Sequence, residues 1–204
     1  NAIAGAQEHG VYAYMKHFAL NDQEGNRNCM AATWSNEQAI REIYLKPFEM
    51  SVKDADCHAV MSSFNYIGNR WAGGCSELLQ NVLRGEWGFL GFVETDYFGV
   101  YGYMTADQAV RNGGDLMLCT TGNDYNKVTV LTNSSKQAMR TAAKNILYTV
   151  VNSRAYEAEN LNPGMAKWKI VLIGADVVAA LLIVGLEYTA IKNYKKRKEE
   201  EEEV

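Results

Sequence analysis

Four short runs of β-branched and aromatic residues alternate with stretches of helical periodicity, and this alternation limits the possible folds more than any other feature. Runs of this composition bounded by turn residues are typical of buried strands. Strands that alternate with helices predict a parallel sheet covered by helices, an α/β fold. Four βα units correspond to half of an eight-stranded (β/α)8 TIM-like barrel. The expected strands are residues 11–15, 58–64, 91–95 and 115–119.

Four helices are expected between and after these strands. The first, over residues 35–55, begins with Ser35 and Gln38 at capping-box spacing, and Pro47 within it predicts a kink or a break. The last is opened by Ser134 and carries apolar residues along one stripe. Shorter helices are expected at 76–84 and 105–112.

A predominantly apolar run of about 21 residues lies near the C-terminus. It extends from Trp168 to Tyr188 and can cross a hydrocarbon core of about 30 Å as a helix, although Asp176 lies near its middle. More basic residues follow the run than precede it, which places the tail in the cytoplasm. We therefore expect a single-pass protein of the cell membrane with an extracytoplasmic folded part. The expected divisions are a domain at 1–155, a linker at 156–167, a transmembrane helix at 168–190 and a charged cytoplasmic tail at 191–204.

Charge and cysteine usage exclude or leave open several further classes. The formal net charge is −4 and the densest basic cluster lies in the tail, so no nucleic-acid partner is expected. The four cysteines, at positions 29, 57, 75 and 119, form neither a CxxC pair nor a zinc pattern. Their spacing leaves open whether all are buried thiols or whether two of them pair in an exported domain.

Asp96 directly follows the expected strand at 91–95 and is the first candidate for chemistry. Side chains at the C-terminal ends of barrel strands point into the mouth of the active site, where a carboxylate can serve as nucleophile or base. Taken alone, Asp96 is equally well explained as a carboxylate that caps the next helix.

Two further clusters lie near the ends of expected strands. Lys16 and His17 combine a cation with an imidazole, and both can donate hydrogen bonds to neighbouring hydroxyl groups of a ligand. Met61 and Phe64 are able to line an apolar wall of a ligand site, although residues of these types more often belong to the core.

A metal site is the rival interpretation of the first cluster. It would require His17, Asp22, Glu24 or His58 to converge, and their spacing does not indicate this. No metal and no cofactor are therefore expected.

Several consecutive segments resemble the barrel domain of glycoside hydrolase family 3. The resemblance follows the same order along the chain from about residue 11 to residue 155, which makes it more specific than a single motif. The segments are KHFALNDQEGNR at 16–27, SNEQAIREIYLKPFE at 35–49, AVMSSFNYIGN at 59–69 and ELLQNVLRGEWGFLGFVETDYFG at 77–99.

The resemblance implies a role for each candidate residue. Asp96 matches the family's catalytic nucleophile, and Lys16 and His17 match the pair that binds hydroxyls of the sugar at the cleavage point. Met61 matches a residue that lines this subsite. Two departures affect the site: Phe64 stands where many members have Tyr, which removes one phenol hydroxyl, and Tyr97 stands where Trp is usual.

The resemblance also implies a β-glucosidase or β-xylosidase, because KHFALNDQEG replaces the KHFPGHG-like motif usual in the N-acetylglucosaminidase branch. A retaining glycosidase needs a second carboxyl group as acid/base, which in this branch comes from a separate α/β sandwich domain. That domain and the N-terminal half of the barrel are missing from this sequence, so we expect a fragment that is inactive alone. The competing interpretations are a membrane-tethered, non-catalytic carbohydrate-binding or scaffold protein of the same fold and, with less support, a signalling protein that pairs helices through Asp176.

Overall fold

The computed structural model describes residues 1–98, 101–120, 122, 124–157 and 164–202. The chain divides into two compact units, residues 1–156 and 157–204. Part of the expected linker, residues 158–163, and the last two residues of the expected tail lie outside the described residues.

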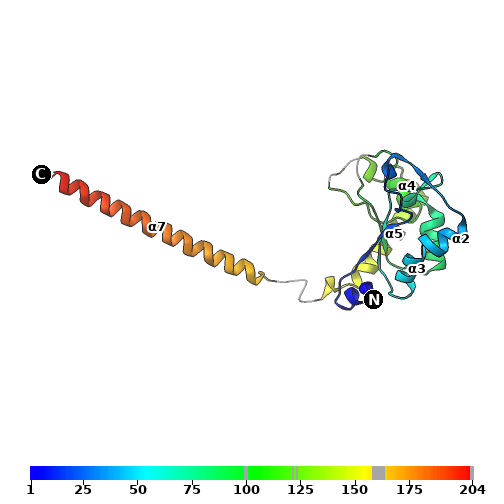
Figure 1. Ribbon diagram of the computed structural model, residues 1–204, viewed down its shortest axis with the longest axis horizontal. Coiled ribbons are helices and arrows are strands. Elements are labelled where there is room, and N and C mark those ends of the chain that lie inside the picture. Colours follow the sequence, from blue (N-terminus) through cyan, green and yellow to red (C-terminus); the bar gives the residue numbers. More distant parts are fainter. Residues whose placement is uncertain (99–100, 121, 123, 158–163, 203–204) are drawn as a thin grey trace. The chain divides into compact units, whose positions relative to one another are not determined.

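A three-stranded parallel sheet forms the centre of the first unit. It contains β1 (Tyr14–Phe18), β3 (Ala59–Ser62) and β6 (Phe92–Thr95) in the order β1-β3-β6. All three strands therefore end at the same edge of the sheet, as an α/β fold requires. Figure 1 shows helices packed around this sheet.

The expected strand at 115–119 is present only as a single parallel bridge between Glu94 and Leu116, which corrects the prediction. Side chains occupy hydrogen-bonding positions that a regular ladder would give to the backbone. The Asp115 carboxylate accepts from Val93 N at 2.7 Å, and Thr95 Oγ1 accepts from Leu118 N at 3.1 Å.

The first strand begins at Tyr14 and not at residue 11 as expected. Residues before it are drawn into the turn that ends α1 (Ala2–Glu8), where Val11 N donates to Ala6 O at 3.1 Å. Val11 is 60% exposed, so its β-branched side chain belongs to a turn and not to a buried strand.

The expected helix at 35–55 consists of α2 (Glu37–Ala39), the π-helical segment η2 (Ile40–Tyr44) and α3 (Lys46–Lys53). Its cap is Asn36, whose side chain accepts from Ala39 N at 2.8 Å, and not Ser35. Pro47 lies in the first turn of α3, where its missing N–H leaves no helical hydrogen bond unmade, so the break falls at the residue before Lys46.

The remaining helices of the first unit cover the sheet. They are η4 (Glu77–Glu86), which is π-helical, α4 (Ala106–Arg111) and α5 (Asn133–Val151). Thr105 caps α4 as the boundary at 105 predicted, with its hydroxyl 3.3 Å from Gln108 N. For α5 the expected start at Ser134 is wrong, because Thr132 is the cap and Ser135 completes a capping box with it.

A small second sheet was not expected from the sequence. It is formed by β2 (Ala32–Thr33), β4 (Tyr66–Ile67) and β5 (Arg70–Trp71) in the order β2-β4-β5. Strands of two residues carry too few side chains for an alternating pattern to be recognised. Short 3₁₀ turns complete this unit: η1 (Arg27–Cys29), η3 (Ala72–Gly74), η5 (Asp124–Asn126) and η6 (Arg154–Tyr156).

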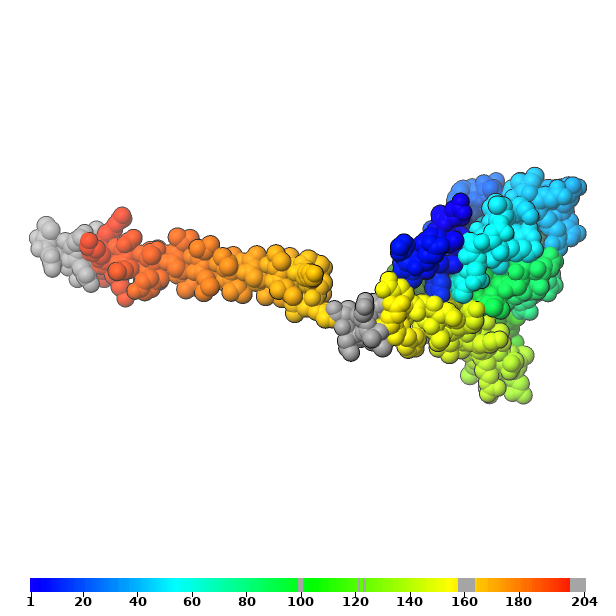
Figure 2. Space-filling model, turned by 90° about the horizontal axis from the view of Figure 1, so that it is seen from below, coloured from blue at the N-terminus to red at the C-terminus, as the bar shows by residue number. Residues whose placement is uncertain are grey.

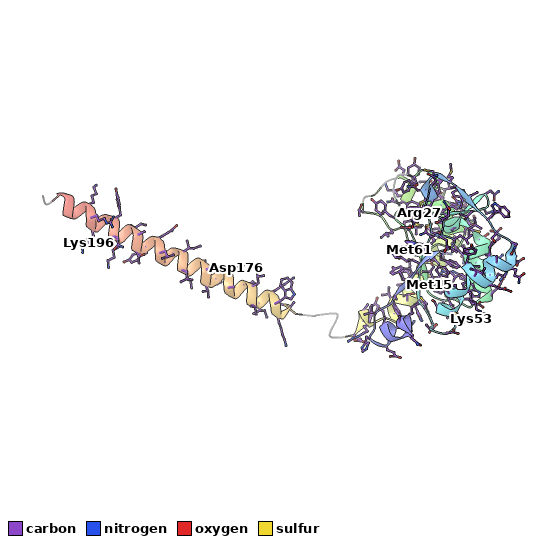
Figure 3. The ribbon with its side chains drawn as sticks, viewed as in Figure 1. Met15, Arg27, Lys53, Met61, Asp176 and Lys196 are labelled. Atoms are coloured by element: carbon purple, nitrogen blue, oxygen red, sulfur yellow. The ribbon has the colours of Figure 1, made fainter. Side chains whose placement is uncertain are left out.

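The two faces of the main sheet differ in burial. Met15, Val60 and Val93 lie on the face that packs against helices and belong to one buried core cluster. On the opposite face Ala59 and Phe92 are buried, whereas Tyr14 and Met61 are only partly buried. Figure 3 shows Met15 and Met61 within the sheet, and Arg27 beyond its end.

The chain ends of the first unit lie side by side (Figure 1 and Figure 2). The Tyr12 hydroxyl donates to Asn152 O at 2.7 Å, and His58 is stacked between Tyr12 and Tyr148 at centroid distances of 4.9 and 5.7 Å. These contacts join the end of α5 to the start of β3. They lie at the edge of the sheet opposite the strand ends.

The second unit contains the single long helix α7 (Lys167–Glu202). Its span Lys167–Lys198 is long and apolar enough to cross a membrane, judged by length and composition, and none of its most apolar window is buried. Figure 2 shows side chains exposed around this helix, and Figure 3 marks Asp176 within it.

All four cysteines are free thiols. Cys57 and Cys75 are buried, whereas Cys29 is exposed and Cys119 is half-buried. Burial raises the pKa of the Cys57 and Cys75 thiols.

Candidate active site

The candidate site forms where the three strands of the main sheet end. Strand β1 ends next to His17, β3 ends at Ser62, and Asp96 follows β6. Asp96 N donates to Ser62 O at 3.0 Å, which continues the β3–β6 ladder by one step. This backbone hydrogen bond fixes the direction in which the Asp96 side chain leaves the sheet.

The Asp96 carboxylate accepts from donors on both oxygens. Oδ2 lies 3.3 Å from His17 Nε2 and 3.5 Å from Arg27 Nη1, and Oδ1 accepts from Tyr97 N at 2.6 Å. The ionised carboxylate matches these surroundings because it accepts hydrogen bonds only. The residue is 8% exposed. It does not cap the next helix, since Thr105 does so for α4.

Asn21 determines which nitrogen of His17 carries the proton. Asn21 Oδ1 accepts from Arg27 Nη1 at 3.1 Å, so the amide nitrogen must face the other way. That nitrogen lies 3.3 Å from His17 Nδ1 and 3.1 Å from Glu24 Oε1. Nδ1 is therefore an acceptor, and the proton of the neutral imidazole is on Nε2, directed at Asp96.

The neutral form of His17 is also favoured by its surroundings. Burial lowers the pKa of His17, the Asp96 carboxylate opposes this effect, and the cations Lys16 and Arg27 add to it. A neutral imidazole can accept from Asn21 and donate to Asp96 at the same time. The imidazolium form would place two N–H donors against each other at Nδ1.

Arg27 connects the loop after β1 to the carboxylate. Its Nε lies 2.7 Å from Glu24 Oε2, its Nη1 contacts Asn21 and Asp96, and its guanidinium carbon lies 4.8 Å from the centre of the Phe64 ring. A planar guanidinium can make these contacts together, whereas an ammonium group cannot. Arg27 thus supplies positive charge next to Asp96.

The other candidate residues, Lys16, Met61 and Phe64, differ in how far they are buried around the His17–Asp96 contact. Lys16 is exposed and lines, with His17, a hollow of about 350 Å³. Met61 is half-buried on the open face of β3. Phe64 is 6% exposed, below Arg27 and part of a second buried cluster that includes Trp71, so it supports the guanidinium from underneath.

Tyr97 is 43% exposed, and its hydroxyl lies 3.0 Å from Thr120 Oγ1. Of the residues singled out from the sequence, His17 and Asp96 are in direct contact, and Tyr97 follows Asp96 in the chain.

The Lys16–His17 and Phe18–Ala19 peptide bonds are cis.

Two residues of the site, Asn21 and Arg27, had no role assigned from the sequence, and Glu24 had been considered only as a ligand of the rival metal site. All three lie in the polar loop that follows β1, within the segment KHFALNDQEGNR. A dense series of amide, acidic and basic side chains immediately after a strand was the available signal. Their partners could not be read from it, because the Arg27–Asp96 contact joins positions 69 residues apart.

The described residues contain no group of three or more His, Cys, Asp or Glu side chains arranged to hold a metal ion. His17 and Glu24, two residues of the rival metal interpretation, are instead connected through Asn21 and Arg27.

Comparison with known proteins identifies a single family. The N-terminal domain of glycosyl hydrolase family 3 matches residues 1–147. Beta-glucosidase B of Emericella nidulans is 44% identical over 114 residues, which are 56% of this chain and 13% of that protein. A beta-glucosidase of Rhizobium radiobacter is 37% identical over 159 residues, which are 76% of this chain and 19% of that protein.

Solved structures agree with the sequence match. Beta-glucosidase 3B from Thermotoga neapolitana in complex with glucose aligns over 78% of this chain and 23% of its own chain, with a TM-score of 0.65 and 31% identity. A beta-glucosidase from Paenibacillus barengoltzii aligns over 78% of this chain and 19% of its own, with a TM-score of 0.65 and 30% identity. The chain thus spans less than a quarter of the length of each of these relatives. With 147 of its residues matched by the family's N-terminal domain, the chain belongs to glycosyl hydrolase family 3.

Proposed function

We propose that this chain carries the nucleophile half of the active site of a retaining β-glycosidase, with Asp96 as the nucleophile. The observation that carries the proposal is the position of the Asp96 carboxylate at a strand end, 3.3 Å from His17 and 3.5 Å from Arg27. The substrate would be a terminal β-glucoside or β-xyloside. The names of the relatives, beta-glucosidases, support this substrate class.

The contacts of Asp96 suit attack on an anomeric carbon. Oδ1 is held by Tyr97 N at 2.6 Å, whereas both contacts of Oδ2 are longer than an ordinary charge-assisted hydrogen bond. Oδ2 therefore keeps electron density available for a new bond to carbon. His17 and Arg27 hold the carboxylate in a fixed rotamer while the bond forms. Lys16 and His17 bind hydroxyls of the same sugar, with the Nε2 proton of His17 shared between Asp96 and a hydroxyl.

A retaining mechanism requires a second carboxyl group about 5 to 5.5 Å from the nucleophile. That group protonates the leaving oxygen and then activates the water that releases the sugar from Asp96. We assign it to the α/β sandwich domain of a longer protein, and we assign this chain to the C-terminal half of a (β/α)8 barrel in that protein. The segment alone is then inactive as a hydrolase.

We further propose that α7 anchors the protein as a single-pass span of the cell membrane, with residues 168–190 in the bilayer. Support comes from the length and apolar composition of Lys167–Lys198. The basic residues after the span place the tail in the cytoplasm and the barrel domain outside.

The experiment that tests the nucleophile is labelling of the complete protein with a 2-fluoro glycoside, which traps the covalent intermediate. We expect one adduct, located on Asp96 by peptide mass spectrometry, and none in Asp96→Asn. Asp124→Asn is the matched control because its side chain is 98% exposed. An adduct on another carboxylate, or turnover that survives Asp96→Asn, would overturn the assignment.

The same variant separates the hydrolase from a non-catalytic carbohydrate-binding or scaffold protein of this fold. If the protein only binds carbohydrate, its wild-type and Asp96→Asn forms should bind a β-glucoside equally well, and neither form should accumulate an adduct. A glycosidase shows binding without an adduct only in the variant.

A further inference from the structure

Trp34 is placed where an indole ring has no structural task. It is 83% exposed, more than Trp168 at 63% and far more than the buried Trp71 and Trp87. In the part of the chain that the structure describes, the indole makes no ring stacking, cation–π contact or hydrogen bond. An exposed indole without intramolecular contacts is free to stack on a ligand, and its ring has an apolar face and a polar N–H for that purpose.

The backbone on both sides of Trp34 is held in place. Thr33 pairs with Ile67 between β2 and β4, and its hydroxyl donates to Tyr66 O at 2.6 Å. Two residues after Trp34, Asn36 caps α2. The exposure of the indole is therefore a property of an ordered surface and not of a loose chain end.

A hollow of about 560 Å³ lies beside the indole. This volume is within the range of about 300–1,000 Å³ that is typical of small-ligand sites. Its walls combine the aromatic rings of Trp34 and Tyr44 with hydrogen-bonding groups. The polar residues along the wall are Asp22, Gln23, Thr33 and Ser35.

This hollow continues toward the candidate active site. Leu20, Asp22 and Tyr44 line both it and the smaller hollow that contains His17. Asp22 follows Asn21, whose amide contacts His17 Nδ1, and His17 Nε2 faces Asp96. The two hollows therefore border each other along Asp22, and the smaller one reaches His17, the residue whose Nε2 contacts Asp96.

We propose that Trp34 is a sugar-binding platform that holds an outer pyranose unit of a β-linked oligosaccharide. The apolar C–H face of a pyranose ring stacks on the indole, and its hydroxyls donate to the Asp22 carboxylate and accept from the Gln23 amide. The inference rests on the proposed function, because it takes the sugar at Asp96 as the end of the same ligand. With this platform the chain binds oligosaccharides more tightly than simple glycosides.

The test measures binding of two probes, cellotetraose and laminaritetraose, and of glucose to the detergent-solubilised full chain. Aromatic stacking contributes about 0.5–1.5 kcal/mol, so Trp34→Ala is expected to weaken binding of the preferred tetrasaccharide by roughly 2- to 13-fold. Trp34→Tyr keeps a flat ring and should restore most of that loss. Glucose binding should not change in either variant. Trp168→Phe, which alters the other exposed indole, is the matched control.

Fluorescence quenching gives a direct readout of the indole. In Trp168→Phe, Trp34 is the single exposed tryptophan, because Trp71 and Trp87 are buried. The preferred tetrasaccharide should protect this fluorescence from iodide, and glucose should not. No protection, no binding of either tetrasaccharide, or an equal loss of glucose and tetrasaccharide binding in Trp34→Ala overturns the proposal.

The outcome is distinguishable from failure of the nucleophile assignment. A 2-fluoro adduct on Asp96 combined with unchanged tetrasaccharide binding in Trp34→Ala overturns only the platform. Trp34-dependent binding without an adduct on Asp96 overturns only the hydrolase mechanism. If Trp34→Ala weakened the binding of an aryl glucoside and left tetrasaccharide binding unchanged, the ring would hold an aromatic aglycone. This result would also overturn the sugar platform.

Discussion

His17 Nε2 lies 3.3 Å from Asp96 Oδ2, and the opposite nitrogen of the same imidazole faces the Asn21 amide at the same distance. The pair joins the end of β1 to the end of β6, two strands that are not neighbours in the sheet. An amide that can only donate to Nδ1 thus sets the tautomer that donates to the carboxylate.

Asn21→Asp should reverse the protonation preference of His17. The new carboxylate would accept from Nδ1, and an opposite charge this close raises a pKa by about 1 to 3 units. We expect the His17 titration, followed by imidazole NMR, to move upward by at least about one pH unit. Asn69→Asp, on an exposed turn, is the control and should leave it in place. A downward shift would contradict the tautomer assignment.

The lowered pKa of His17 in the wild-type chain predicts how the free energy of unfolding depends on pH. Burial holds the pKa of His17 below its ordinary 6.5 in the folded chain, so below pH 6.5 the unfolded chain binds more protons. The free energy of unfolding should therefore fall as the pH is lowered from about 6.5 through the folded pKa. In Asn21→Asp this contribution should change sign. Urea unfolding at several pH values measures it.

Arg27→Lys should impair catalysis although the charge is kept. An ammonium group cannot contact Glu24, Asn21 and Asp96 together while it lies over the Phe64 ring. Hydrogen bonds to charged groups contribute about 1.5–3 kcal/mol, so kcat/KM of the complete protein should fall by roughly 10- to 150-fold. Arg70→Lys, whose side chain is 51% exposed in a surface pair with Glu77, is the control. Equal losses in the two variants would argue against a specific role.

Asp115→Asn should destabilise the first unit. The Asp115 carboxylate is 2% exposed and accepts from Arg84 at 2.6 Å, Val93 N at 2.7 Å and Asn145 at 2.9 Å. An amide would turn an NH₂ group toward one of these donors and leave the charge of Arg84 without a negative partner. Breaking one side of a buried ion pair costs about 3–5 kcal/mol.

The measurement is urea unfolding of the solubilised chain, followed by tryptophan fluorescence. Asp124→Asn, on the surface turn η5, should unfold at the wild-type urea concentration. If Asp115→Asn also did so, the buried network would not contribute to stability as the geometry indicates.

Cys29 offers a test of membrane orientation. It is the exposed thiol of the chain, and Cys57 and Cys75 are buried. A membrane-impermeant maleimide should label Cys29 on intact cells, and Cys29→Ser should remove most of the signal. A cysteine introduced at Tyr194 should react only after the cells are permeabilised. Labelling with the opposite pattern would reverse the proposed topology, and recovery in the soluble fraction would remove the membrane anchor.

The alternation of strand and helix was readable from the sequence, because apolar periodicity reports local burial. It identified β3 and β6 nearly to their ends and predicted the Thr105 boundary. It misplaced the first strand by three residues, since the α1 turn that draws in Val11 depends on a helix with no strong sequence signal. It also assigned a full strand at 115–119, where side chains of Asp115 and Thr95 take the backbone's partners.

The candidate site shows the same division. Residue type and order along the chain determined the α/β class, the apolar C-terminal helix and the candidacy of Asp96, because each depends on neighbours close in sequence. Only the tertiary structure brought Arg27 and Asn21 to Asp96 and His17 and left Trp34 exposed beside a hollow, since parallel strands carry distant residues to one sheet edge. Contacts across that edge depend on strand register and side-chain direction, which no local pattern of residues encodes.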